Sequence, residues 1–226
     1  MFMKIGHRGA MGHAPENTLL SFSTALKMKV DMIELDVTLC QSGEAVVIHD
    51  DRLERTTDGN GYVKDHNLED LKRLNAGKGE QIPTLVESLN FINRKVPTNI
   101  ELKNGAVVPA VIKIVNQLVK EQGWSLDDFL ISSFDHHALK AFKTHIPDIR
   151  IGVLLGIIPL DYAAMAKHLN AYAINPCIDF INQAFVEDAK MKGLKTFVWT
   201  VNYAEDIKRM QLLGVDGIFT NYPDRL

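Results

Sequence analysis

Short apolar runs alternate with longer amphipathic stretches along almost the whole chain of 226 residues. Runs of this length are typical of buried β-strands, and the stretches between them are typical of covering helices. Eight such units in a chain of this size are typical of a (β/α)8 TIM barrel, so we predict this α/β fold. The predicted strands are Lys4–Gly6, Met32–Val37, Asn99–Leu102, Phe129–Ser132, Ile149–Leu154, Ala171–Ile174, Lys195–Thr200 and Val215–Thr220.

Local signals mark several of the helices between these strands. Apolar residues recur at helical spacing through Pro109–Lys120, which predicts an amphipathic helix. Thr84 and Glu87 have the spacing of a capping box, which predicts a helix start. Asn202 and Glu205 give a weaker version of the same signal.

The segment from Asp50 to Gln81 is rich in turn residues and does not fit the barrel pattern. We predict that it forms an insert, at about residues 50–81, after the second strand, with a short helix over Leu68–Leu74 capped by Asn67. The last predicted strand ends near Thr220, so the final helix is expected to be truncated or missing. We expect residues 1–226 to form a single TIM-barrel domain.

Composition excludes several classes of partner. The formal net charge is −3, without a basic stripe, which argues against nucleic-acid binding. The two cysteines, Cys40 and Cys177, show no metal-binding spacing and fit a reducing compartment. No apolar run reaches membrane-spanning length, and no secretory signal precedes the first strand, so we expect a cytoplasmic protein.

The second predicted strand carries Glu34 and Asp36 two positions apart. In a strand these side chains project to the same face, while the apolar residues between them project to the other. Two buried carboxylates at neighbouring positions repel each other unless a cation lies between them. The pair therefore predicts a cation site, although an exposed strand end would explain it without one.

The third strand repeats this device with Glu101 and Lys103. Alone, such a pair is usually a structural ion pair, but beside Glu34 and Asp36 it adds a third carboxylate to the same cavity. Three carboxylates without clustered thiolates suit a hard divalent ion, Mg²⁺ or Ca²⁺ before Mn²⁺. Lys103 would then be free to meet an anionic ligand.

The first strand ends in His7 and Arg8, which stand between Gly6 and Gly9. Strand ends at the C-terminal face are where TIM barrels hold their active groups. His7 can transfer a proton near neutral pH, and Arg8 can bind a phosphate with two donors. A lone histidine at a strand end is usually structural, but one beside an arginine between glycines favours a functional role.

His49 joins this set through an expected hairpin. Ser42-Gly43 is turn-like, and a strand folding back around these two residues would place residue i opposite residue 85 − i. Asp36 would then face His49 at about 4.5–5.5 Å. Trp199 ends a strand and could line the same pocket, although such a residue is more often part of a core. Capping or solvent exposure is expected for the other histidines, His13, His66, His136, His137, His145 and His168.

Together these residues resemble the glycerophosphodiester phosphodiesterase family over nearly the whole chain. The resemblance rests on the order and spacing of Gly6-His7-Arg8-Gly9, Pro15-Glu16-Asn17-Thr18, Glu34-Leu35-Asp36-Val37, His49-Asp50, Arg55-Thr56-Thr57, Pro83-Thr84-Leu85, Ile100-Glu101-Leu102-Lys103, Ser133-Phe134, Trp199-Thr200-Val201-Asn202 and Gly214-Val215-Asp216-Gly217-Ile218.

The resemblance implies a metal-dependent hydrolase that converts small-molecule glycerophosphodiesters to sn-glycerol 3-phosphate and an alcohol. It assigns one divalent cation, Mg²⁺ or Ca²⁺, to Glu34, Asp36 and Glu101. It makes His7 and His49 the general base and the general acid, and it gives phosphate contacts to Arg8 and Lys103. Glu16 and Trp199 match pocket positions. Asn221 stands where the family often has an aspartate. We expect this departure to affect loop packing more than activity.

Two other readings stay open at this point. A glycoside hydrolase could use Glu34 with Asp36 or Glu101 as acid and base, but this leaves both histidines, Arg8 and Lys103 without a role. A catalytically silent barrel that binds phosphorylated ligands would not need both histidines beside the acids. The sequence also leaves open whether a glycerol hydroxyl attacks first, giving a cyclic phosphate, or water attacks directly.

Overall fold

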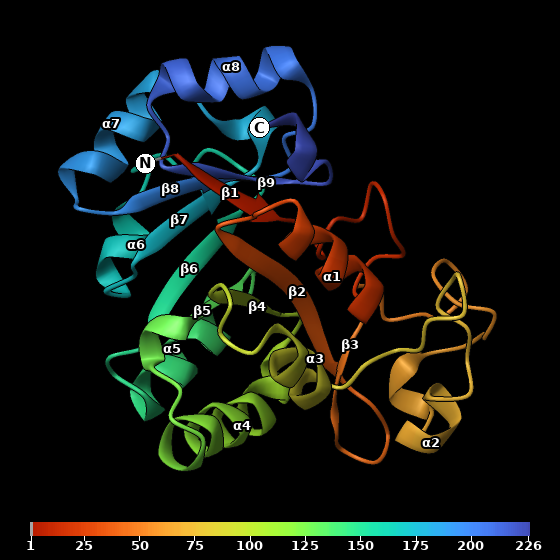
Figure 1. Cartoon of the computed structure of the whole chain (residues 1–226). Helices are drawn as coiled ribbons and strands as arrows, with labels where there is room; N and C mark the ends of the chain where they lie inside the picture. The colour runs from red at the N-terminus through yellow and green to blue at the C-terminus, as the bar shows by residue number, and fades with distance from the viewer. Residues whose placement is uncertain (1) are drawn as a thin grey trace.

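Parallel strands close into a barrel that forms the body of the molecule (Figure 1). The structure is a computed structural model and describes residues 2–226. β1 pairs with both β2 and β9, which closes the barrel and confirms the predicted TIM-barrel fold. Within the described residues the barrel strands are β1 (Met3–Gly6), β2 (Met32–Leu39), β4 (Thr98–Leu102), β5 (Phe129–Ser133), β6 (Arg150–Leu155), β7 (Ala173–Pro176), β8 (Lys195–Val198) and β9 (Gly217–Thr220).

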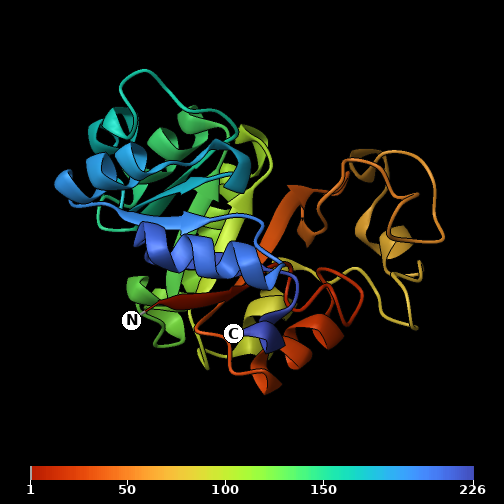
Figure 2. The same ribbon diagram turned by 90° about the horizontal axis from the view of Figure 1, so that it is seen from above.

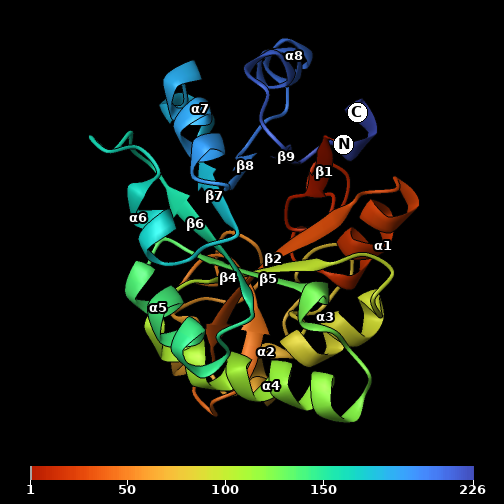
Figure 3. The ribbon, with the colours of Figure 1, turned by 90° about the vertical axis from the view of Figure 1, so that its left-hand side faces the viewer.

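Helices connect the strands and cover the outside of the barrel (Figure 3). They are α1 (Leu19–Lys27), α3 (Leu85–Ile92), α4 (Val108–Glu121), α5 (His136–His145), α6 (Ala164–His168), α7 (Gln183–Met191) and α8 (Ala204–Leu213). After β9 the described part of the chain forms a 3-10 turn, η5 (Pro223–Arg225). No helix in residues 2–226 has both the length and the apolar character that a bilayer crossing requires.

The helix signals in the sequence have different outcomes. α4 contains the predicted Pro109–Lys120 helix. The predicted capping box opens α3: Thr84 Oγ1 accepts from the backbone N–H of Glu87 at 3.2 Å, and Glu87 Oε2 accepts from the N–H of Thr84 at 2.7 Å. The Asn202 signal was wrong, because α8 begins at Ala204 without a side-chain cap. The Asn202 side chain instead accepts a hydrogen bond at the end of β9.

Apolar residues pack on both sides of the sheet. The larger cluster fills the space between the strands and the helices, as expected for strands covered on one face by helices. A smaller cluster fills the interior of the barrel at its base, and it includes Ile5, Met32, Leu130, Phe197 and Phe219. The polar residues two positions further along these strands therefore lie above an apolar floor, at the C-terminal end of the barrel.

A hairpin extends β2 beyond the barrel, but its register differs by one residue from the prediction. β3 (Ala45–Val47) pairs antiparallel with β2 so that Thr38 lies opposite Val46. The predicted two-residue turn is a three-residue loop, in which Gly43 has φ +92° and its N–H bonds to the carbonyl of Cys40. Residue i therefore faces 84 − i, and Ile48 rather than His49 lies opposite Asp36, whose carbonyl accepts from Ile48 N–H at 3.1 Å.

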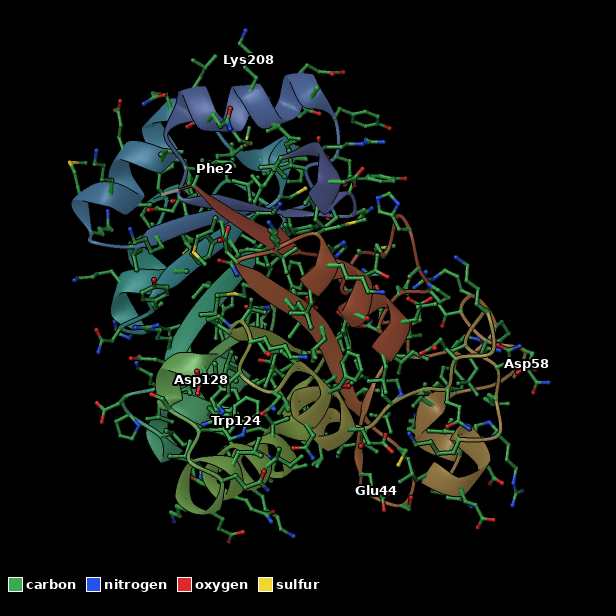
Figure 4. The ribbon with its side chains drawn as sticks, viewed as in Figure 1. Phe2, Glu44, Asp58, Trp124, Asp128 and Lys208 are labelled. Atoms are coloured by element: carbon green, nitrogen blue, oxygen red, sulfur yellow. The ribbon has the colours of Figure 1, made fainter. Side chains whose placement is uncertain are left out.

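The insert, residues 50–81, stands beside the barrel mouth (Figure 2). It contains a 3-10 turn, η1 (Val63–Asp65), and the helix α2 (Leu68–Leu71), which is capped by Asn67 as predicted but shorter than expected. Its apolar side chains form a cluster of their own with residues of the hairpin, among them Val46, Leu53, Val63 and Leu71. Figure 4 shows Asp58 at the outer edge of the insert and Glu44 at the tip of the hairpin.

Candidate active site

A hollow of about 480 Å³ opens at the C-terminal end of the barrel strands. It contains six of the residues that the sequence singled out, since its lining includes His7, Arg8, Glu34, His49, Glu101 and Trp199. Glu16 and Lys103 are not in this lining but hydrogen-bond to Arg8 and Glu101 within it, and Asp36 forms an ion pair with Arg8. The residues proposed from separate parts of the chain therefore meet at one place.

Three acids form a cluster at this hollow, two of them in its lining. Glu34 and Asp36 are 2% and 1% exposed, and each offers an oxygen within 4.8 Å of one from Glu101. Burial, with repulsion from Asp36 and Glu101, raises the pKa of Glu34 well above its usual value. Burial and the Asp36 charge also raise the pKa of Glu101 to about 7. Although burial opposes it, the charges of Lys103 and Arg8 lower the pKa of Asp36.

The acid cluster fits a hard divalent cation. Glu34 Oε2 accepts from the backbone N–H of Arg8 at 2.7 Å, but Glu34 Oε1 is buried and has no hydrogen-bond partner among residues 2–226. A buried carboxylate oxygen without a partner carries a desolvation cost that a bound cation would remove. Because Mg²⁺ and Ca²⁺ prefer carboxylate oxygens, Glu34, Asp36 and Glu101 are a suitable donor set.

Two cations are held against the acids. Lys103 Nζ lies 2.8 Å from Glu101 Oε1 and 3.3 Å from Asp36 Oδ1. Arg8 Nη1 donates to Glu16 Oε1 at 2.7 Å, and its Nε lies 3.2 Å from Asp36 Oδ2 without hydrogen-bond geometry. The sequence predicted that Lys103 would be free for an anion, but in this structure its ammonium group bonds to two of the acids.

The turn that carries His7 and Arg8 depends on Gly9. Gly9 has φ +85°, and a Cβ at this position would collide with Ser21 in α1. Ser21 Oγ donates to the carbonyl of Arg8 at 2.8 Å and accepts from Ala10 N–H at 2.9 Å. The first strand therefore ends in a tight turn that is fixed against α1 and directs both side chains to the hollow.

His7 has a neutral partner in Asn221. Its Nδ1 lies 2.7 Å from Asn221 Oδ1, and because a carbonyl oxygen only accepts, the ring proton lies on Nδ1 and Nε2 is left as a base. Burial, with the charge of Arg8, lowers the pKa of His7 to about 4. The sequence led us to expect an effect on loop packing more than on activity, but the side chain of this asparagine contacts the candidate base directly.

His49 has a charged partner instead. Its Nδ1 lies 2.5 Å from Asp50 Oδ1, and the Asp50 carboxylate receives Arg55 Nε at 2.5 Å and Nη2 at 2.8 Å. The hydrogen bond from Arg55 holds the pKa of Asp50 far below its usual range. Arg55 also donates to both oxygens of Glu16 at 2.8 Å. A continuous chain of polar contacts thus joins His49 in the insert region to Glu16 and Arg8 after β1.

The order of these residues along the chain matches a known family. A sequence profile described as the glycerophosphoryl diester phosphodiesterase family matches residues 7–225. The chain belongs to this family. It is therefore an enzyme of the phosphoric diester hydrolase class.

Relatives within the phosphodiesterase family match over nearly their full length. A glycerophosphodiester phosphodiesterase of Caldanaerobacter subterraneus is 40% identical, over 98% of this chain and 95% of that protein. One of Bacillus subtilis is 33% identical, over 98% of this chain and 84% of that protein. Among solved structures, an Oleispira antarctica phosphodiesterase in complex with the product sn-glycerol-3-phosphate is 33% identical, with a TM-score of 0.91 over 98% of this chain and 93% of that one.

The hollow of this phosphodiesterase also contains Phe134 and Asn99, to which the sequence analysis assigned no role. Phe134 and Trp199 form an aromatic wall, with ring centroids 5.4 Å apart and planes at 90°. Asn99 lines the hollow and donates to Ser132 Oγ at 2.8 Å, and its buried Oδ1 has no partner in the described part of the chain. The two-residue period could have identified them, because Asn99 lies two positions before Glu101 and Phe134 two positions after Ser132.

Proposed function

We propose that this chain, acting as a single domain, hydrolyses glycerophosphodiesters to sn-glycerol 3-phosphate and an alcohol. The observation that most supports the proposal is the buried acid cluster, in which Glu34 Oε1 has no partner among residues 2–226. Two histidines line the same hollow, and their Nδ1 atoms have different partners, Asn221 and Asp50. The Oleispira antarctica phosphodiesterase supports the proposal, since its solved structure holds sn-glycerol-3-phosphate.

In this proposal Glu34, Asp36 and Glu101 hold one divalent cation, Mg²⁺ or Ca²⁺. Bound there, the ion would act as a Lewis acid on a non-bridging phosphate oxygen. Arg8 and Lys103 stand at the edge of the same cluster, where their donors can contact the remaining phosphate oxygens. Their pairing with the acids holds both cations in place before a substrate binds.

The two histidines transfer protons in opposite directions. His7 Nε2 takes the proton of the attacking hydroxyl, because its Nδ1 proton is donated to Asn221. His49 gives a proton to the oxygen of the departing alcohol as the P–O bond breaks. Asp50 fixes the His49 ring through Nδ1, so that Nε2 is the donor. The attacking group is either the neighbouring glycerol hydroxyl or water, and trapping of a cyclic phosphate would identify the first.

In this proposal the glycerol arm occupies the part of the hollow lined by Asn99, Phe134 and Trp199. Phe134 and Trp199 would pack against its carbon atoms, and the free Oδ1 of Asn99 would accept from one hydroxyl. Glu16 does not line this hollow but bonds to Arg8, so we assign it to orienting that arginine rather than to direct substrate contact.

A coupled assay for sn-glycerol 3-phosphate tests the proposal over glycerophosphodiesters with choline, ethanolamine, glycerol and inositol arms. EDTA should abolish turnover, and Mg²⁺, Ca²⁺ or Mn²⁺ added separately should restore it to different extents. A protein that binds glycerol 3-phosphate but turns over no diester would be a silent binding barrel. Activity on glycosides that persists in EDTA would favour a glycoside hydrolase.

A further inference from the structure

A second hollow, of about 860 Å³, lies at the barrel mouth between the end of β2, the insert and the loop after β4. The residues that line it and bear on its chemistry are Thr38, Asp51, Tyr62, Lys64 and Asn104. The proposed chemistry uses none of them. Backbone contacts fix its walls. Arg52 and Tyr62 form an isolated antiparallel β-bridge, and the carbonyl of Asp51 accepts from the N–H of Val63 at 2.9 Å.

Three elements connect this second hollow directly to the acid cluster. On β2, Thr38 follows Asp36 by two positions and projects to the same face, about 7 Å further along the strand. Asp51 follows His49 by two positions. Asn104 follows Lys103 directly. Glu34 and Glu101 line the first hollow, and Thr38 and Asn104, a few positions further along the same two segments, line the second.

A phosphodiester needs two such spaces, because its two ester arms leave the phosphorus atom in different directions. We propose that the second hollow binds the departing alcohol and that it selects a polyhydroxylated alcohol, such as glycerol or a cyclitol, over a quaternary ammonium alcohol. This inference rests on the diesterase activity proposed above. It places His49 between the hollows, where its proton reaches the oxygen that joins the alcohol to phosphorus.

The lining chemistry carries the preference. Asp51 has no ion pair or side-chain hydrogen bond within residues 2–226, so its carboxylate can accept from alcohol hydroxyls. Lys64 can donate, and Asn104, whose Oδ1 accepts from Ala106 N–H at 3.0 Å, keeps its amide donors. The half-exposed Tyr62 ring would attract a quaternary ammonium, but Arg52 and Lys64 already lie 4.8 and 5.4 Å from its centroid. A third cation would be repelled by both.

The test compares kcat/KM for glycerophosphoglycerol, glycerophosphoinositol, glycerophosphocholine and the truncated glycerophosphoethanol. The wild type should prefer the two polyol arms over choline. Asp51→Ala and Asn104→Ala should each lower kcat/KM for polyol arms about tenfold, with a change within about twofold for the ethanol arm, because each removes hydrogen bonds made only by the longer alcohol. Asp65→Ala is the matched control, since Asp65 is an exposed acid of the same insert outside the hollow.

Inhibition by sn-glycerol 3-phosphate serves as the check on folding, because the product fills only the first hollow and its inhibition constant should not change. If the wild type hydrolyses none of these diesters, the proposed function fails. If it hydrolyses them but prefers choline, or if Asp51→Ala and Asn104→Ala lower all four substrates equally, the second hollow is not the alcohol subsite. Should one variant fail to fold, the other still decides between these outcomes.

Discussion

His7 Nδ1 and Asn221 Oδ1 lie 2.7 Å apart although 214 positions separate the two residues in the chain. The closing register of the barrel places them together, because Ile5 pairs with Phe219 and Gly6 with Thr220. Asn221 is itself held by Asn202, whose Oδ1 accepts from the Asn221 backbone N–H at 2.9 Å. The proposed base is therefore oriented by residues that follow the last two strands.

Replacement of Asn221 by aspartate should change the pH profile. A carboxylate beside the ring favours the protonated imidazole and so raises the pKa of His7 from its value of about 4. Since the base must be neutral, the acidic limb of kcat/KM should move up by about one to two pH units. Asn60→Asp, an exposed change in the insert, is the control. An unchanged acidic limb in Asn221→Asp would show that this ring does not set the limb.

The two histidine roles can be separated by the leaving group. His49→Ala should reduce kcat on glycerophosphoethanol by about 10²–10⁴. With a p-nitrophenyl arm, which departs without a proton, most of this loss should disappear in His49→Ala but persist in His7→Ala. His66→Ala should have no such effect, because that ring bonds to the Asn60 carbonyl in the insert. Equal losses of His49→Ala on both substrates would exclude His49 as the acid.

Metal-free protein should lose stability as pH rises, through Glu101. Its folded pKa of about 7 lies above the usual 4.5, so between these values the folded carboxyl keeps a proton that the unfolded chain releases. Stability therefore falls across this window by up to about 1.4 kcal/mol per pH unit, and Glu101→Gln should remove that component.

Urea unfolding of both proteins in EDTA at pH 5 and pH 7.5 measures this difference. In EDTA, the free energy of unfolding of Glu101→Gln should rise relative to that of the wild type as pH rises. Saturating Mg²⁺ should again make the wild type the more stable of the two. Glu205→Gln, an exposed change on α8, should leave the pH dependence unaltered. A parallel pH dependence of Glu101→Gln and wild type would contradict the assignment of a buried, repelled carboxyl.

Arg55 should matter for turnover although it lies outside the main hollow. It binds Asp50 and Glu16 together, so Arg55→Met should loosen the His49 ring and lower kcat about tenfold. Arg55→Lys should recover only part of this, because one ammonium group cannot reproduce four guanidinium contacts. Arg73→Met removes a comparable but exposed ion pair with Glu69 and should leave kcat unchanged. If Arg55→Met kept the kcat of the wild type, Asp50 would not need its ion pair with Arg55 to orient the His49 ring.

Local periodicity was sufficient to predict much of the site. Glu34 and Asp36 share a face because strand side chains alternate, whatever the rest of the chain does, and the same holds for Glu101 and Lys103. Their meeting in one hollow follows from the parallel register of β2 and β4, which pairs Asp36 with Glu101. The barrel itself was predictable for the same reason, since each βα unit is marked by nearby residues.

Features set by loop conformation or by distant register were not predictable in this way. The hairpin shifted by one residue because Gly43 adopts a left-handed φ in a three-residue loop, whereas the prediction assumed a two-residue turn at Ser42-Gly43. Asn221 was misjudged because its partner lies across the closing strands. Trp199 and Phe134 meet only when β5 and β8 face each other across the barrel.

The pairing of β1 with β9 has a consequence for biosynthesis. A polypeptide emerging from the ribosome carries the three acids and His49 early. One edge of β1, the strand before His7, stays unpaired until residues 217–221 have been made, and these residues also supply Asn221, the partner of His7. Hydrolytic activity is therefore expected to arise in one late step rather than to grow with chain length. Fragments that stop before that segment are expected to lack this activity.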